Sequence, residues 1–111
     1  MTLNEYQSLA QRTSADHDKV LNGVLGLCGE SGEVADLLKK HKHQGHEFSR
    51  EKMIEELGDV LWYCAELAEG LGVTLEDVAK GNVAKLLKRY PEGFTSERSI
   101  CREEERHVEQ S

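Results

Sequence analysis

The sequence predicts an all-α protein, and three observations lead to this prediction. The 111 residues include only one proline, Pro91, and proline is the residue that most disfavours a helix interior. Leucine, alanine, glutamate and lysine are abundant, and β-branched residues nowhere alternate with polar ones as they would in a strand. Four segments instead repeat apolar residues at spacings of three and four. We therefore expect a four-helix bundle.

The first helix is expected over about residues 3–12, because Thr2 and Glu5 have the spacing of a capping box. The second is expected over about residues 18–42, where apolar residues again recur on one side. This second segment contains three glycines at a spacing of three, which are Gly26, Gly29 and Gly32. Either these glycines let another backbone or a ligand approach closely, or they break the helix.

The third helix is expected over about residues 50–69, with Ser49 as its N-cap. The fourth is expected over about residues 75–89, and Pro91 and Gly93 stop it. The third helix has a broad apolar face made of Met53, Ile54, Leu57, Val60, Leu61, Cys64 and Ala68. Such a face predicts burial against other helices.

The length and the charge limit the organisation and the partners of the chain. A chain of this length fits one domain, which we place at residues 1–94, followed by a charged tail at residues 95–111 that forms a frayed or partner-docked helix without an assigned function. A core of this size is small, so we expect oligomerisation, as a homodimer or homotetramer, to complete the bundle. The net charge of −7 argues against a protein that coats a nucleic acid polymer.

The sequence also predicts a cytoplasmic protein with no membrane association. It has no run of about 18 apolar residues that could cross a bilayer, and its first residues lack the apolar core of a signal peptide. The three cysteines, Cys28, Cys64 and Cys101, are odd in number and form no C-x-x-C pair. Neither a disulfide framework nor a cysteine zinc site is therefore indicated.

Four acidic residues occupy positions where an amphipathic helix should be apolar. Glu30 and Glu33 are three apart on the second predicted helix, and Glu56 and Asp59 are three apart on the third. Because residues three apart share a helix face, two adjacent helices would bring four carboxylates together. Such a group persists when it is protonated, solvated or bound to cations, and its oxygen ligands suit Mg²⁺, with Mn²⁺ as a substitute. The alternative is that these acids only cover a solvated helix surface.

At these residues the chain resembles the MazG-like family of all-α nucleoside triphosphate pyrophosphohydrolases. The segment GLCGESGEVADLLKK and the later EELGDVLWY follow the E-x-x-E, spacer, E-x-x-D pattern of that family. A third block, NVAKLLKRYPEGF, resembles the family's next helix, and Asn82, Lys85 and Arg89 are the matching positions. The resemblance covers roughly residues 3–94.

The resemblance implies Mg²⁺-dependent hydrolysis of a nucleoside triphosphate, often a deoxy one, to the monophosphate and pyrophosphate. It implies that Glu30, Glu33, Glu56 and Asp59 are catalytic metal ligands, one of which could also serve as general base. Asn82, Lys85 and Arg89 would bind the substrate, and their spacing on one helix face suits phosphate contact. The alternative for the lysine and the arginine is surface charge on a solvated helix.

Several questions stay open at this stage. The sequence does not choose the base or the sugar of the substrate. The histidine-containing segment from His41 to His46 could bind a metal or phosphate, or could be an exposed polar loop. A non-catalytic helical module that binds a nucleotide or a partner, or a structural dimerisation bundle, would be the alternatives to an enzyme.

Overall fold

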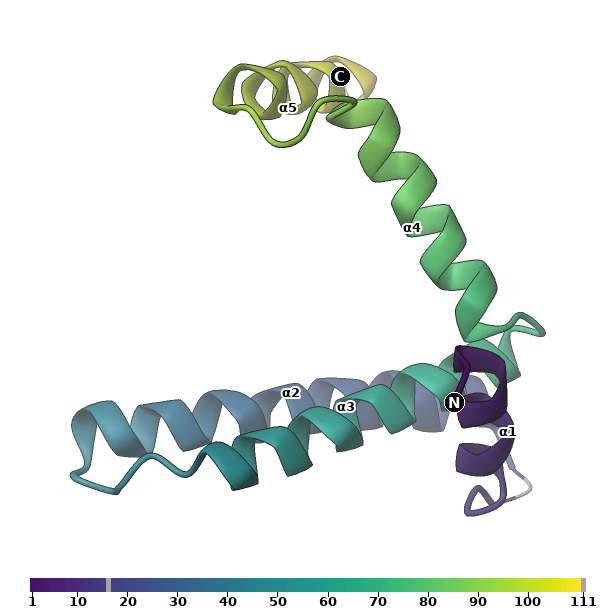
Figure 1. Cartoon of the computed structure of the whole chain (residues 1–111), viewed down its shortest axis with the longest axis vertical. Helices are drawn as coiled ribbons and strands as arrows, with labels where there is room; N and C mark the ends of the chain where they lie inside the picture. Colours follow the sequence, from purple (N-terminus) through teal and green to yellow (C-terminus); the bar gives the residue numbers. More distant parts are fainter. Residues whose placement is uncertain (16, 111) are drawn as a thin grey trace. The chain divides into compact units, whose positions relative to one another are not determined.

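The computed structural model describes residues 1–15 and 17–110, with side chains described up to residue 104. The described part is helical and contains no strand, which confirms the all-α class. The helices are α1 (Leu3–Gln11), α2 (Lys19–His43), α3 (Arg50–Gly70), α4 (Leu75–Arg89) and α5 (Ser96–Gln110); Figure 1 shows them along the chain. The first four match the predicted ranges to within one residue at each end. The charged tail forms the fifth.

Side-chain caps explain where the first three helices begin. The hydroxyl of Thr2 accepts a hydrogen bond from the backbone N–H of Glu5 at 3.1 Å, and Asp18 and Ser49 cap α2 and α3 in the same way. These caps satisfy backbone donors that have no partner within the first helical turn. Since α2 continues from Lys19 to His43, its glycines do not break it.

The chain divides into two compact units, residues 1–76 and residues 77–111. The division falls inside α4, after its first two residues. In the first unit α2 and α3 lie side by side and antiparallel, and α1 packs on α3 near the end remote from the α2–α3 loop (Figure 1). The predicted domain, residues 1–94, spans the first unit and the start of the second, and it stays a prediction.

The buried core of the first unit is small and lies where α1 meets α3. It consists of Ala10, Ala65, Ala68 and Leu75, with Tyr6, Trp62 and Cys64 packed against it. The indole N–H of Trp62 donates to the carbonyl of Ala10 at 3.1 Å and to the hydroxyl of Thr13 at 2.9 Å. Because Ala10 lies in the last turn of α1 and Thr13 just after it, Trp62 fixes that end of α1 to α3.

A buried glutamine attaches the α3–α4 turn to α1. The side-chain oxygen of Gln7 accepts from the backbone N–H of Leu75 at 2.6 Å, and its nitrogen donates to the carbonyl of Val73 at 3.1 Å. The same nitrogen donates to the carboxylate of Glu69 at 2.8 Å. Gln7 therefore supplies hydrogen-bond partners to this turn, including the backbone N–H of the buried Leu75.

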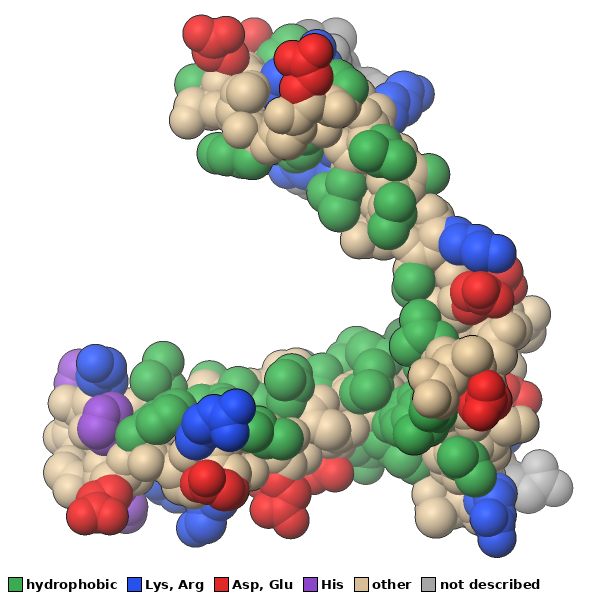
Figure 2. Space-filling model, in the orientation of Figure 1, with side chains coloured by type: hydrophobic (Ala, Val, Ile, Leu, Met, Phe, Trp, Pro, Cys, Tyr) green, Lys and Arg blue, Asp and Glu red, His purple; other side chains and the backbone are tan. Residues whose placement is uncertain are grey.

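Much of the apolar face predicted for the third helix is exposed in the single chain. Leu57 is 59% exposed, and Ile54 and Leu61 are also exposed, as are Val24 and Leu25 of α2. Figure 2 shows hydrophobic side chains spread along the α2–α3 pair. Among the described residues, no helix combines the length and the apolar character that crossing a membrane requires.

Candidate metal centre on α2 and α3

Glycines set how closely α2 and α3 approach. A Cβ atom on Gly23 would lie 2.8 Å from both the Cα and the Cβ of Leu67, and one on Gly70 would lie 2.8 Å from the backbone nitrogen of Val20. Neither position has space for a side chain without a shift of the neighbouring helix. This close antiparallel register places Glu30 of α2 next to the turn of α3 that carries Glu56.

The carboxylates of Glu30, Glu56 and Asp59 form a cluster, hereafter the carboxylate cluster. One oxygen from each side chain lies within 4.8 Å of the other two. Glu30 and Glu56 are half-buried, whereas Asp59 is exposed. Of the four acids selected from the sequence, Glu33 is exposed and is not one of these three.

The electrostatics of the carboxylate cluster are repulsive. A hydrogen bond with Glu30, then partial desolvation, then the negative charges of Glu30, Asp59 and Glu55 all raise the pKa of Glu56. Because every one of these influences disfavours ionisation, the pKa shift indicates negative charge that the neighbouring side chains do not offset. Three carboxylate oxygens at this separation are hard ligands and suit Mg²⁺ or Mn²⁺.

Another carboxylate of α3, Glu66, was not singled out from the sequence. It is fully buried. It accepts hydrogen bonds from Ser14 at 2.7 Å, Asn22 at 2.9 Å and Gln11 at 3.1 Å, and the ammonium of Lys19 lies 3.6 Å away. Burial raises the pKa of Glu66, but these hydrogen bonds and the lysine charge outweigh it and hold the pKa below its ordinary value. The only sequence signal was an acid among apolar residues, the same signal that marked the carboxylate cluster.

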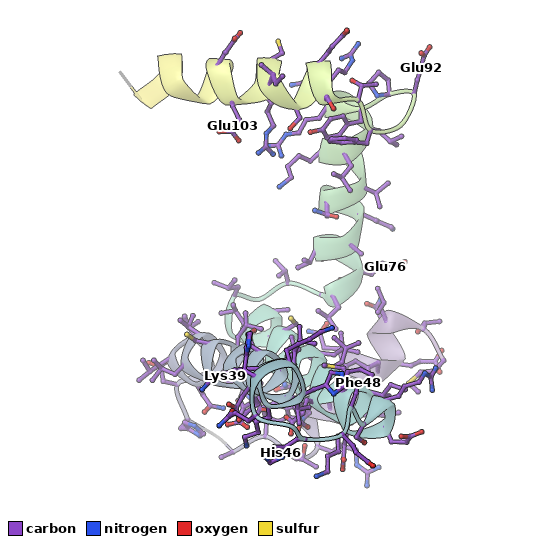
Figure 3. The ribbon with its side chains drawn as sticks, turned by 90° about the vertical axis from the view of Figure 1, so that its left-hand side faces the viewer. Lys39, His46, Phe48, Glu76, Glu92 and Glu103 are labelled. Carbon is purple, nitrogen blue, oxygen red and sulfur yellow. The ribbon has the colours of Figure 1, made fainter. Side chains whose placement is uncertain are left out.

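The basic end of α2 is occupied by local interactions. Lys40 pairs with Asp36 at 2.9 Å, and this contact lowers the pKa of Asp36 and raises that of Lys40. The Nδ1–H of His41 donates to the carbonyl of His46 at 2.9 Å, and the ring of His41 packs on Phe48 with centroids 5.6 Å apart. Figure 3 shows this end of the α2–α3 pair facing the viewer. The contacts of His41 hold together the loop that connects α2 and α3.

The predicted substrate-binding residues lie on α4, in the second unit. Asn82, Lys85 and Arg89 follow one another at spacings of three and four, so they share one helix face. Asn82 and Lys85 are exposed and Arg89 is half-buried. The second unit thus presents a face with two cations and an amide, while the carboxylate cluster belongs to the first unit.

Two proteins found by comparison are similar to this chain over most of its length. The chain is similar to the gene 37 protein of Mycobacterium phage L5, with 40% identity over 74 residues, which cover 63% of this chain and 65% of that protein. It is also similar to the uncharacterized protein YvdC of Bacillus subtilis (strain 168), with 36% identity over 73 residues, which cover 58% of this chain and 69% of that protein. The chain thus spans about two thirds of the length of these relatives. No solved structure matches it.

A family model describes most of the chain. Residues 19–94 match the MazG nucleotide pyrophosphohydrolase domain. The matched range begins with α2, includes α3 and its carboxylates, and ends after α4. This chain belongs to the MazG nucleotide pyrophosphohydrolase domain family.

Proposed function

We propose that this chain is a Mg²⁺-dependent nucleoside triphosphate pyrophosphohydrolase that releases the monophosphate and pyrophosphate. The observation that carries the proposal is the convergence of Glu30, Glu56 and Asp59, from two helices, with oxygens within 4.8 Å of one another. Membership of the pyrophosphohydrolase family makes a free nucleotide, rather than a nucleic acid polymer, the substrate class that we propose.

In this proposal the carboxylates of α2 and α3 hold the cation. Glu30, Glu56 and Asp59 are the ligands that the geometry supports, and Glu33, one helical turn after Glu30 and exposed, is the proposed fourth. When bound, Mg²⁺ supplies the positive charge that offsets the triphosphate and activates water for attack at the α-phosphorus. One carboxylate of the group accepts the proton from that water.

The basic face of α4 is proposed to bind the phosphates. Lys85 and Arg89 would contact non-bridging oxygens and stabilise the charge that develops on the departing pyrophosphate. Asn82, three residues before Lys85, would orient the phosphate or the sugar by hydrogen bonding. The exposed apolar residues of α2 and α3 support a homodimer or homotetramer, because their burial against another copy would remove apolar surface from water. Light scattering coupled to gel filtration tests this, and a monomer would contradict it.

The test is a product assay that separates nucleotides by chromatography. The purified chain is incubated with Mg²⁺ and a panel of ribo- and deoxynucleoside triphosphates, beside the variants Glu56→Gln and Asp59→Asn. We expect monophosphate and pyrophosphate from the wild type and a loss of at least about 100-fold in both variants. Glu55→Gln is the matched control, since Glu55 is an exposed neighbour on α3 outside the carboxylate cluster, and it should keep most of the activity.

The products separate the alternatives. Diphosphate and orthophosphate would contradict cleavage at the α-phosphorus. Absence of turnover combined with Mg²⁺-dependent nucleotide binding would contradict the enzyme and favour a non-catalytic nucleotide-binding module. Equal activity in the wild type and in both cluster variants would contradict the assignment of the carboxylates.

A further inference from the structure

Tyr63 and Gly26 make a contact between α2 and α3 on the α1 side of the carboxylate cluster. Gly26 is four residues before Glu30, and Tyr63 is four residues after Asp59. Residues four apart lie one above the other on a helix face. The contact between Gly26 and Tyr63 is therefore one helical turn from the carboxylates on both helices.

The ring of Tyr63 occupies the space that the missing side chain of Gly26 leaves. A Cβ atom on Gly26 would collide with ring carbons of Tyr63, namely Cδ1, Cε1 and Cζ. The glycines closer to the acids differ from Gly26, because a Cβ on Gly29 or Gly32 would meet nothing within 4 Å. Within this repeat of three glycines, only Gly26 is therefore in close contact with α3.

The ring of Tyr63 is also restricted on another side. It packs edge-on against Trp62, with ring centroids 5.0 Å apart and planes at 82°. Trp62 is itself held to the end of α1 by its two hydrogen bonds. Because its neighbour is fixed, the ring of Tyr63 has limited freedom to rotate away from a new atom on α2.

We propose that Tyr63, seated against Gly26, is a positioning residue that sets the separation of α2 and α3 at the carboxylate cluster. A larger residue at position 26 would push the helices apart and would separate Glu30 from Glu56 and Asp59. Loss of the ring would let the helices shift. Tyr63 acts in this way through the backbone, without touching the cation. The proposed consequence for cation affinity rests on the proposed function of the cluster, whereas the consequence for helix spacing does not.

The experiment is a double-mutant cycle read by Mn²⁺ affinity, measured by calorimetry on the full chain. We expect Gly26→Ala and Tyr63→Leu each to weaken Mn²⁺ binding by about tenfold or more, the range typical of residues that support metal ligands. In the double variant the added methyl group fills the space that the ring left, so the affinity should return to within about threefold of the wild type. Gly29→Ala is the matched control, and it should leave the affinity unchanged.

Equal Mn²⁺ affinity in Gly26→Ala and Gly29→Ala, or an unchanged affinity in Tyr63→Leu, would overturn the proposal. If Gly26→Ala does not fold, Tyr63→Leu alone decides. Crystal structures of the metal-free variants give a second readout that does not depend on cation binding. The oxygens of Glu30, Glu56 and Asp59 should stay within 4.8 Å in Gly29→Ala and separate in Gly26→Ala. If the wild type neither binds Mn²⁺ nor hydrolyses nucleotides, the proposed function fails, and the crystal structures still decide the positioning role.

Discussion

Two sites on α3, Glu66 and the carboxylate cluster, surround their carboxylates with opposite kinds of neighbours. At Glu66 the protein supplies three hydrogen-bond donors and a nearby ammonium, and the pKa of the carboxyl lies below its ordinary value. About two to three turns away, the acids of the carboxylate cluster lie next to one another, and the pKa of Glu56 is raised. Glu66 is fully buried, whereas the carboxylate cluster is half-buried or exposed.

This difference separates an acid whose charge is offset within the chain from acids whose neighbouring side chains do not offset their charge. A buried charge is tolerated when it is paired and hydrogen-bonded, and Glu66 meets that condition within the chain. The carboxylate cluster, which is half-buried or exposed, meets it with protons, with solvent or with a cation. Acidity on an apolar face is therefore an ambiguous signal, and the partners of each carboxylate resolve it.

Loss of the Glu66 carboxylate is expected to produce the largest change in stability. The substitution Glu66→Ala leaves three half-buried donors without their acceptor. It also removes the negative partner of the Lys19 ammonium, which keeps its hydrogen bonds to Gln11 and Ser14. Removing one member of a buried charged pair costs about 3–5 kcal/mol, and because the Lys19 side chain is 25% exposed, we expect the lower end, about 3 kcal/mol. Urea unfolding measures this free energy.

The control for that prediction is Glu55→Ala, on the same helix and exposed. It should change the free energy of unfolding by less than about 0.5 kcal/mol. A cost at Glu66 that is no greater than at Glu55 would contradict the structural role of the buried network.

Binding of a divalent cation at the carboxylate cluster is expected to raise the stability of the folded chain. If the carboxylate cluster binds Mg²⁺, a concentration of 100 times the dissociation constant stabilises the folded chain by about 2.7 kcal/mol. For a chain of this size that corresponds to about 10 °C in the midpoint of thermal unfolding. Thermal unfolding with EDTA and with Mg²⁺ measures the shift.

The variant Glu56→Gln should lose this Mg²⁺-dependent stabilisation, whereas Glu55→Gln should keep it. In the absence of metal Glu56→Gln should also be at least as stable as the wild type, because it removes one charge from a repulsive group. An equal Mg²⁺ shift in both variants would place the cation elsewhere.

The helices were predictable from local signals, and the role of each acid was not. Thr2 and Ser49 identified helix starts because a cap depends on residues three positions apart. The role of Glu66 depends on Gln11 and Asn22, which lie 55 and 44 positions away. No local sequence pattern predicts partners so far apart in the chain. A structural carboxylate and a candidate metal ligand therefore look alike in the sequence.

The role of each glycine in the α2 repeat also could not be predicted from local sequence. Gly26 and Gly29 belong to one regular repeat, and the sequence allowed a close approach for all of its members or a break in the helix. In the structure the approach occurs at Gly26, where Tyr63 fills the space, and not at Gly29. The register of α3 against α2 decides this, and register is a tertiary property.

The stability should depend on pH in opposite ways at Glu56 and at Glu66. We expect these changes in stability to be smaller than those predicted above. The ordinary pKa of a glutamate is 4.5, and the folded value is raised at Glu56 and lowered at Glu66. A raised folded pKa means that the metal-free folded state holds an extra proton just above pH 4.5, so stability decreases as the pH rises from there through the folded pKa. A lowered folded pKa means that ionised Glu66 stabilises the folded state above pH 4.5. This stabilisation is lost as the pH falls through the folded pKa.

Urea unfolding in EDTA, at a series of pH values from about 3 to 8, measures both slopes. Glu56→Gln should flatten the decrease above pH 4.5, and Glu66→Gln should flatten the loss on the acid side, whatever each variant does to the absolute stability. Saturating Mg²⁺ should abolish the first slope in the wild type and leave the second intact, because the cation replaces the proton at one site and has no place at the other. If Mg²⁺ altered the acid-side slope instead, the contrast between a carboxylate satisfied within the chain and one proposed to bind a cation would be wrong.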